Sequence, residues 1–82
     1  MCTRVLYETG VQTYMVGRTM DWSDMKSGAD WWVFPRRMKR DGGAGEGTIT
    51  WTSKYGSLVV SIYQLASCDG MNEAGLVRNM LY

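Results

Sequence analysis

Short runs of β-branched and aromatic residues recur along this chain between polar or glycine-containing segments, a pattern typical of β-strands joined by turns. Near the start, TRVLYET (residues 3–9) and TYMVGRTM (residues 13–20) both have this character. Between them, Gly10 is suited to a tight turn. The pattern therefore predicts a β-hairpin over residues 2–20.

Further strands are predicted along the rest of the chain. The apolar run WWVF (31–34) is closed by a proline, and residues 48–63 predict two strands on either side of the sequence KYG. The second of these, SLVVSIY (57–63), is apolar enough to be covered on both faces. A turn at NEAG (72–75) then leads into a last strand.

The segments between these strands are polar. Residues 21–30 predict a loop, and RRMKRDGGAGEG (36–47) is a basic run that ends in a flexible glycine loop. No segment has the pattern of a clear amphipathic helix, since Gly75 counts against one over residues 71–81. About six strands without a covering helix would expose edges and an apolar face. We therefore expect this chain to be part of a larger fold.

Composition narrows the classes of function. The chain has 82 residues, 45% of them hydrophobic and 21% charged, which indicates a globular segment and not a disordered one. A net charge of +1 gives no electrostatic reason to expect nucleic acid or an anionic membrane as partner. We find neither a signal peptide nor an apolar run of about 18 residues, so the expected location is the cytoplasm, with reduced thiols.

The reactive residue types are few. There are two cysteines, Cys2 and Cys68, without a CxxC pair, and there is no histidine. The spacing does not suggest a zinc site, and the glycine-rich segment lacks the GxxxxGK[ST] phosphate loop. We therefore expect neither a metal nor a cofactor. The missing histidine also excludes Ser-His-Asp and Cys-His mechanisms.

Cys2 is the most suggestive position, because removal of Met1 would give it a thiol and a free α-amine. An α-amine has a pKa near 8, so it is partly a free base near neutral pH. Arg18 could supply a cation that favours the thiolate, and Asp21 could accept a hydrogen bond from the α-amine. These groups fit hydrolysis of an amide by an N-terminal nucleophile.

The geometry of this group is a problem on a regular strand. Arg18 and Asp21 are an odd number of residues apart, so their side chains would point to opposite faces. Both could approach Cys2 if the strand bends or ends near Thr19. The alternative is that Cys2 is a small buried hydrophobic residue, Arg18 a solvated charge and Asp21 a turn residue.

Several motifs resemble those of one enzyme family. MCTRVLY, GRTMDW, WVFPRRMKR, WTSKYGSLVVS and DGMNEAGLVRNMLY occur here in the same order and at similar spacings as in the choloylglycine hydrolase and penicillin V acylase family. This family consists of linear amide hydrolases of the N-terminal nucleophile superfamily. The resemblance covers essentially all of residues 1–82. It implies an α+β fold, of which this chain is the β-rich N-terminal portion of a four-layer αββα sandwich.

The resemblance also implies roles for particular residues. Cys2 would be the nucleophile after removal of Met1, and Arg18 and Asp21 would belong to the catalytic group. Tyr82 would lie beside the oxyanion hole, where bile salt hydrolases usually carry Asn and acylases carry Tyr or Trp. The blocks SKYGS and NEAGL would serve the sheet.

Family members carry a further catalytic Asn and Arg well beyond position 82. An oxyanion-hole donor contributes about 10²–10³ in rate, so we expect no robust hydrolysis from these 82 residues alone. The implied partners are a small amide substrate and the remainder of the domain or other copies of the chain. A tetramer is implied for the full-length bacterial enzyme.

The nature of the amide depends on the residues behind the predicted catalytic strand. Met20, Trp22, Trp31 and Trp32 would suit a phenoxyacetyl or fatty acyl group. This favours a penicillin V acylase or an acyl-homoserine lactone acylase over a bile salt hydrolase. The alternative for the tryptophans is packing in the core.

A non-catalytic chain, either a degenerate remnant or a β-rich association module, is the competing hypothesis. Other features have structural explanations. The basic run at positions 36–40 is expected at a solvated surface or a subunit contact. Cys68 is expected to be buried, and Asn72 and Asn79 are expected to be turn and strand residues.

Overall fold

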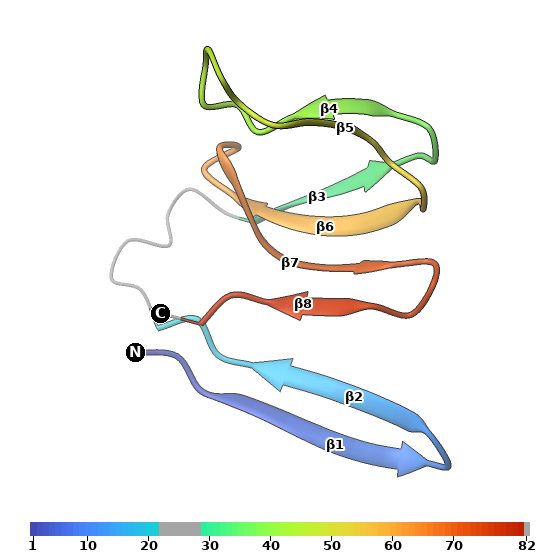
Figure 1. Ribbon diagram of the computed structural model, residues 1–82. Helices are drawn as coiled ribbons and strands as arrows, with labels where there is room; N and C mark the ends of the chain where they lie inside the picture. The colour runs from blue at the N-terminus through green and yellow to red at the C-terminus, as the bar shows by residue number, and fades with distance from the viewer. Residues whose placement is uncertain (22–28, 82) are drawn as a thin grey trace. The chain divides into compact units, whose positions relative to one another are not determined.

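The computed structural model of the protein describes residues 1–21 and 29–81, which form eight β-strands and no helix. This part of the chain accordingly contains no helix of the length and apolarity that crossing a bilayer requires. The chain divides into two compact units, Met1–Ser27 with Met80–Tyr82, and Gly28–Asn79. Figure 1 follows the strands of each unit along the chain.

The first unit contains the predicted hairpin. Strand β1 (Arg4–Gly10) pairs antiparallel with β2 (Thr13–Arg18). The turn lies within TGVQ (residues 9–12), where it was expected; Gly10 still pairs with Thr13, and the turn itself falls on residues 11–12. Gln12 adopts the left-handed conformation there, with φ 54°. No residue of the range 1–21 is buried.

The second unit is built on an antiparallel sheet in the order β3-β6-β7-β8. Its strands are β3 (Ala29–Phe34), β6 (Ser57–Ile62), β7 (Ala66–Asn72) and β8 (Val77–Asn79). The strands predicted from the apolar runs are thus confirmed. Strand β6 lies inside the sheet, and its Ser61 is buried whereas its other residues are half-buried. Cover on both faces of this strand stays a prediction.

A short hairpin includes part of the basic run. Strand β4 (Lys39–Asp41), which the sequence did not predict, pairs with β5 (Thr50–Thr52), the strand expected before KYG. The Arg40 guanidinium lies 3.8 Å from the centre of the Phe34 ring and 5.7 Å from that of Trp51. These cation–π contacts favour an extended, ordered backbone at Arg40.

Three loops of the second unit are joined by one carboxylate. Glu73, in the turn between β7 and β8, accepts hydrogen bonds from Nε and Nη2 of Arg36, the latter at 2.7 Å. The backbone N–H of Gly56 donates to the same carboxylate at 2.7 Å. The Arg36 bonds, followed by the Gly56 bond, lower the pKa of Glu73 to about 2. The NEAG and KYG blocks therefore serve the sheet, as the resemblance implied.

Asn72 begins the same turn. Its side-chain Oδ1 accepts hydrogen bonds from the backbone N–H groups of Ala74 and Leu76, each at 3.0 Å. Gly75 completes the turn with φ 86°, a conformation that favours glycine. Asn79 lies in β8 and donates to Asp69 at 3.3 Å. Both asparagines are turn and strand residues, as predicted.

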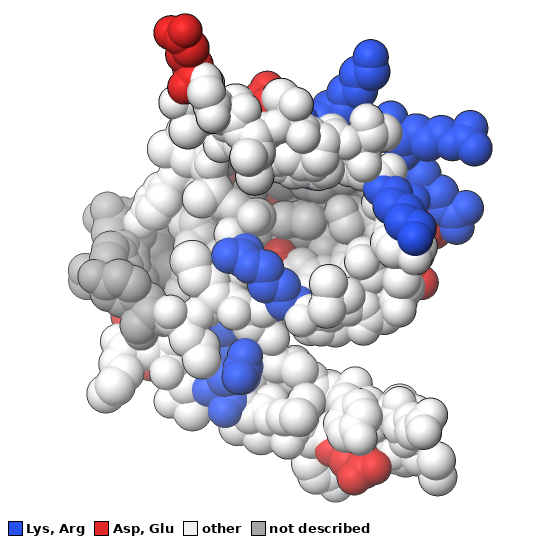
Figure 2. Space-filling view, viewed as in Figure 1, with Lys and Arg blue, Asp and Glu red and all other residues white. Residues whose placement is uncertain are grey.

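The basic run has more structure than a solvated surface requires. Figure 2 shows basic side chains gathered beside the turn between β3 and β4. Two of the four residues make the contacts given above, Arg36 with Glu73 and Arg40 with the aromatic rings. Arg37 forms the turn itself, with φ 62°, and its side chain is exposed, as is that of Lys39. A subunit contact at this run stays a prediction.

Candidate active site

The start of the chain lies beside the end of β2, at the open end of the first hairpin (Figure 1). The last pair of the ladder, Arg4 and Arg18, brings Thr3 opposite Thr19. The Thr19 backbone N–H donates to the Thr3 carbonyl at 2.9 Å. The chain therefore continues alongside itself for at least one pair beyond the strands.

The ladder changes character at this pair. In each hydrogen-bonded pair of a regular antiparallel ladder, the two opposite residues exchange two backbone hydrogen bonds. Here the Thr3 N–H donates to the Thr19 hydroxyl Oγ1 at 3.1 Å. Strand β2 ends at Arg18, so residues after it are not bound to the alternation of a strand. An end of the strand near Thr19 is the condition under which Arg18 and Asp21 could both approach Cys2, and β2 ends one residue before it.

Asp21 is joined to the same corner by two contacts. The Thr19 hydroxyl donates to Asp21 Oδ2 at 3.3 Å. The N-terminal ammonium of Met1 lies 3.5 Å from the Asp21 backbone carbonyl and donates to it. Cys2 thus stands between two residues, Met1 and Thr3, that are both hydrogen-bonded to the segment 19–21.

Exposure differs among the predicted residues at this corner. The side chains of Cys2, Arg18 and Met20 are half-buried, and Asp21 is exposed. The prediction that Cys2 is buried was the competing alternative, and the half-buried state of Cys2 does not match it.

Sequence reasoning missed Thr19 as a member of this group. The signal was available, because a β-branched hydroxyl residue stands between the two charged residues of GRTMD, at the point where the strand had to end. Threonine often bonds nearby backbone groups with its hydroxyl, in competition with the regular ladder.

The other predicted site residues do not all belong to this corner. Trp22 and Tyr82 lie outside the described residues. Trp31 and Trp32 belong to β3, in the second unit. As neighbours in a strand they face opposite sides of the sheet.

Trp32 lines an aromatic hollow of about 550 Å³ in the second unit, together with Phe34, Arg40 and Trp51. Its ring stacks with that of Phe34, with centres 6.4 Å apart. The Trp32 Nε1–H donates to the Ser61 hydroxyl at 3.0 Å. The hollow falls within the usual size range of ligand pockets, about 300–1,000 Å³. Trp31 does not line it and is 69% exposed.

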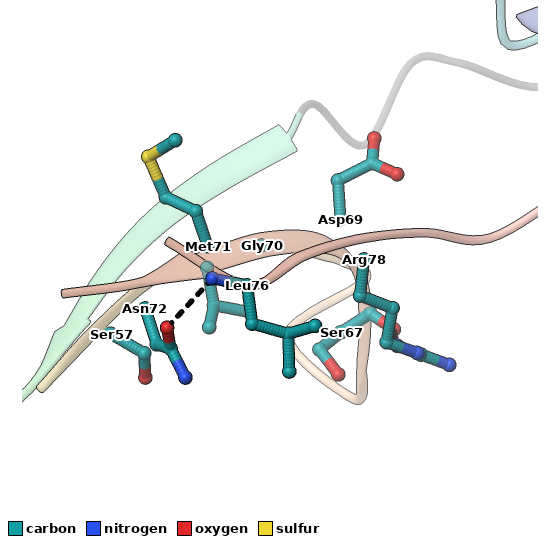
Figure 3. Close-up of a pocket in the computed structure, with 9 residues that line it drawn as sticks. Ser57, Ser67, Asp69, Gly70, Met71, Asn72, Leu76 and Arg78 are labelled. Atoms are coloured by element: carbon teal, nitrogen blue, oxygen red, sulfur yellow. Dashed lines mark hydrogen bonds between the residues drawn. The ribbon is translucent and has the colours of Figure 1, made fainter. Parts of the chain in front are cut away.

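A second hollow lies over β6, β7 and β8 and has a volume of about 160 Å³. Figure 3 shows its lining, with the hydrogen bond from the Leu76 N–H to the Asn72 side chain at one side. This volume is below the usual range for ligand pockets. Among its polar residues, Asn72 accepts the turn N–H groups of Ala74 and Leu76, and Arg78 donates to the Ser67 carbonyl at 3.3 Å.

Cys68 is separate from the chemistry predicted for Cys2. Its side chain is 1% exposed, and its thiol donates to the Val60 carbonyl at 3.2 Å. The prediction of a buried thiol is confirmed. Neither cysteine forms a disulfide.

Comparison with known proteins finds two similar acylases. A penicillin V acylase of Pectobacterium atrosepticum is 40% identical over 88 aligned positions, which include 99% of this chain and 23% of that protein. A solved structure of penicillin V acylase from Agrobacterium tumefaciens is 46% identical, with a TM-score of 0.83, over 96% of this chain and 24% of that one. The chain therefore spans about a quarter of the length of these relatives.

These similarities confirm the β-rich N-terminal portion of the family fold, which the resemblance implied. The sequence model of the family described as linear amide C–N hydrolases, choloylglycine hydrolase family, matches residues 2–82. Because this match covers nearly the whole chain, the protein belongs to the choloylglycine hydrolase family of linear amide C–N hydrolases.

Proposed function

We propose that this chain carries the nucleophile of an amidase of the penicillin V acylase or acyl-homoserine lactone acylase type. After removal of Met1, Cys2 is the nucleophile and its α-amine is the base. Arg18 is the cation that favours the thiolate, and Asp21 orients the α-amine. The reaction is hydrolysis of a linear amide bond.

The first half of the reaction transfers the acyl group to the protein. The Cys2 thiol gives its proton to the α-amine while its sulfur bonds to the amide carbon. The carbon–nitrogen bond then breaks, and the departing nitrogen takes the proton from the α-amine. The amine product leaves, and the acyl group stays on Cys2 as a thioester.

The second half releases the acid. The α-amine takes a proton from water as the water oxygen bonds to the thioester carbon. The carbon–sulfur bond breaks, the sulfur recovers a proton, and the carboxylic acid leaves. The same amine thus acts as base and acid in each half, which is what a chain without histidine needs.

The position of Cys2 is the observation that carries this proposal. Thr3 is held to the segment after β2, because its N–H donates to the Thr19 hydroxyl at 3.1 Å and its carbonyl accepts from the Thr19 N–H at 2.9 Å. Neither contact involves Met1, so after its removal the adjoining Cys2 still lies beside the charged end of β2. Association through exposed strands would not require this arrangement at the first residues of the chain.

The acyl preference is supported by the aromatic residues and by the relatives. Both similar proteins described above carry the name penicillin V acylase. Aromatic side chains suit a phenoxyacetyl or long acyl group, and the chain carries Trp22, Trp31 and Trp32 soon after GRTMD. These observations favour such acyl groups over bile salts.

The chain needs further groups for turnover. It spans about a quarter of its relatives, and an oxyanion-hole donor from elsewhere in the domain would contribute about 10²–10³ in rate. The proposed partner is accordingly the remainder of the family domain, with Tyr82 beside the oxyanion hole. A homo-oligomer of the whole enzyme belongs to the same proposal.

The first test is the intact mass of the protein before and after incubation with a thiol-reactive β-lactam. The proposal expects loss of Met1 and one adduct, mapped to Cys2, with Cys68 unmodified as the buried internal control. Retained Met1 without an adduct would contradict a competent site in this chain.

A second test uses activity in a protein that carries the whole domain. Cys2→Ser should lose most of the hydrolysis and keep the fold, because a hydroxyl is far less ionised than a thiol. Comparing kcat/KM for a phenoxyacetyl amide with that for a glycine-conjugated bile acid decides the acyl preference. Full activity in Cys2→Ala would overturn the nucleophile assignment.

A further inference from the structure

We propose that Thr19 is a positioning residue, whose hydroxyl holds the Cys2–Thr3 peptide and the Asp21 carboxylate in one fixed arrangement. This inference rests on the function proposed above for Cys2 and Asp21. It adds a residue that contacts neither substrate nor reacting atoms and acts through the two groups that do.

The hydroxyl of Thr19 acts both as a hydrogen-bond acceptor and as a donor. As acceptor it takes the Thr3 N–H at 3.1 Å, and as donor it gives its proton to Asp21 Oδ2 at 3.3 Å. A hydroxyl has one proton to donate and lone pairs to accept, so one Oγ1 atom satisfies both contacts. The Thr19 backbone N–H adds a third bond, to the Thr3 carbonyl at 2.9 Å.

The first contact fixes the main chain next to the nucleophile. The Thr3 nitrogen belongs to the peptide that joins Cys2 to Thr3, so holding that nitrogen limits rotation of the Cys2 backbone. Since the α-amine and the side chain of Cys2 branch from the same Cα, their direction follows from this peptide. A misplacement of about 1 Å in reacting groups can cost about 10²-fold in rate.

The second contact fixes the carboxylate. With Oδ2 held by Thr19, the plane of the Asp21 carboxylate is set and Oδ1 is left to accept from the α-amine of Cys2. Threonine suits this task because its β-branched side chain is stiff at χ1, so the hydroxyl direction is set by the backbone.

The same hydroxyl also explains how the strand ends. The Thr19 hydroxyl accepts the Thr3 N–H, which in a regular ladder would donate to the Thr19 carbonyl. The backbone can therefore leave the strand after Arg18. Arg18 and Asp21 are therefore not confined to opposite faces, despite their odd separation.

Another threonine of the hairpin provides a matched control. Thr9 donates its hydroxyl to the backbone carbonyl of Thr13 at 3.3 Å, near the turn at the other end of the hairpin. Thr9→Val removes a hydroxyl–backbone bond from the same hairpin without changing the contacts of Thr19.

The experiment compares Thr19→Val, Thr19→Ser and Thr9→Val in a protein that carries the whole domain. Valine keeps the branched shape and removes the hydroxyl, whereas serine keeps the hydroxyl. We expect Thr19→Val to lower kcat by about tenfold to a hundredfold with little change in KM, because the hydroxyl does not contact substrate. Thr19→Ser should recover most of kcat, and Thr9→Val should match the parent protein.

The rate at which iodoacetamide alkylates Cys2 gives a readout without turnover. Thr19→Val should change this rate and Thr19→Ser should restore it, with Cys68 as the protected thiol in each sample. Equal kcat and equal alkylation in Thr19→Val would overturn the inference, as would failure of serine to rescue either. Loss of hydrolysis in Thr9→Val would mean that the hairpin, and not the Thr19 hydroxyl, is responsible.

The proposed function of Cys2 and the positioning role of Thr19 can be overturned separately. Hydrolysis that survives Cys2→Ala overturns the proposed function whatever Thr19 does. A protein that loses hydrolysis in Cys2→Ala and keeps it in Thr19→Val retains the function and overturns only the positioning role.

Discussion

The hairpin of the first unit and the four-stranded sheet of the second unit use their polar side chains differently. In the sheet unit, the Glu73 carboxylate joins Arg36 and the Gly56 backbone, and so ties three loops together. In the hairpin, the Thr19 hydroxyl and Asp21 bind the first residues of the chain. One set of contacts holds strands in register, and the other holds the segment that carries Cys2.

The two units also differ in how many of their described residues are buried. The sheet unit buries Ser61 and Cys68, whereas no residue of the range 1–21 is buried. A two-stranded hairpin is at best marginally stable in water. Under the proposed function, the polar contacts at the end of this hairpin orient the reactive groups. Substitutions in the two regions should therefore separate stability from chemistry.

The largest expected effect is that of Asp21→Asn. Asparagine has one acceptor oxygen where aspartate has two, and it carries no negative charge. It therefore cannot accept from both the Thr19 hydroxyl and the α-amine of Cys2 as the carboxylate can, so proton transfer at Cys2 should suffer. We expect kcat/KM for a phenoxyacetyl amide to fall by about 10²–10⁴-fold, the usual contribution of positioned acid–base groups. The urea midpoint of unfolding should change little. Both are measured on a protein that carries the whole domain.

Asp41→Asn is the matched control for this prediction. Asp41 accepts the Gly43 N–H at 2.8 Å in the loop after β4, so its contact belongs to the second unit. The Asp41→Asn substitution should leave kcat/KM unchanged. If Asp41→Asn impaired hydrolysis as much as Asp21→Asn, the division between the two regions would not hold.

The next effect compares one glycine from each region. A Cβ at Gly70 in β7 would lie 3.1 Å from the Leu58 carbonyl oxygen and 3.2 Å from Val59 Cγ2. Gly70→Ala should therefore destabilise by about 1–3 kcal/mol, as overpacking does. At Gly17 in β2 no described atom lies within 4 Å of a Cβ, so Gly17→Ala should stabilise by about 0.4–1 kcal/mol.

Urea unfolding of the two variants measures both effects. Opposite signs would support a close approach of strands at Gly70 and open space at Gly17. Equal stabilisation by both substitutions would mean that the backbone at Gly70 moves aside at no cost.

The paired strands were largely predictable from the sequence because strand residues are marked by type and turns by glycine, Pro35 and Asn72. The exception was a strand that is stabilised by residues from other segments of the chain. β4 was missed because its residues are basic, and the rings that favour its extended form, Phe34 and Trp51, come from other segments. The type of a residue does not reveal which side chains from other segments will contact it.

The members of the candidate site stay a prediction, and their geometry could not be derived from the sequence. The types and order of Cys2, Arg18 and Asp21 indicated amide hydrolysis, and the family match agrees with that reaction class. The sequence could not decide how residues at an odd separation meet. That depends on a side chain replacing a backbone acceptor at Thr19, which alternation along a strand does not encode.

A smaller effect is expected for the Trp32–Ser61 hydrogen bond in the sheet unit. Trp32→Phe removes the donor and leaves the buried Ser61 hydroxyl without this 3.0 Å contact. We expect a loss of about 1 kcal/mol in the free energy of unfolding. In the Ser61→Ala background the same substitution should cost less, and a double-mutant cycle measures the difference. Equal costs in both backgrounds would mean that the bond contributes nothing.

The smallest effect should depend on pH. Bonds from Arg36 and Gly56 lower the pKa of Glu73 from its ordinary value of 4.5 to about 2, so the folded state favours the ionised carboxylate. This contribution to stability is complete above pH 4.5, decreases as the pH falls, and is gone below about pH 2. Thermal midpoints of Glu73→Gln and the parent protein should therefore differ most near neutral pH and converge across this window.

In an Arg36→Gln background the difference should shrink, because the first cause of the pKa shift is removed. It should not vanish, since the Gly56 N–H still favours the carboxylate. Because the pair is exposed, added salt should reduce the difference as well. A constant difference from pH 7 to pH 2 would contradict the lowered pKa and would assign the effect of Glu73 to the turn alone.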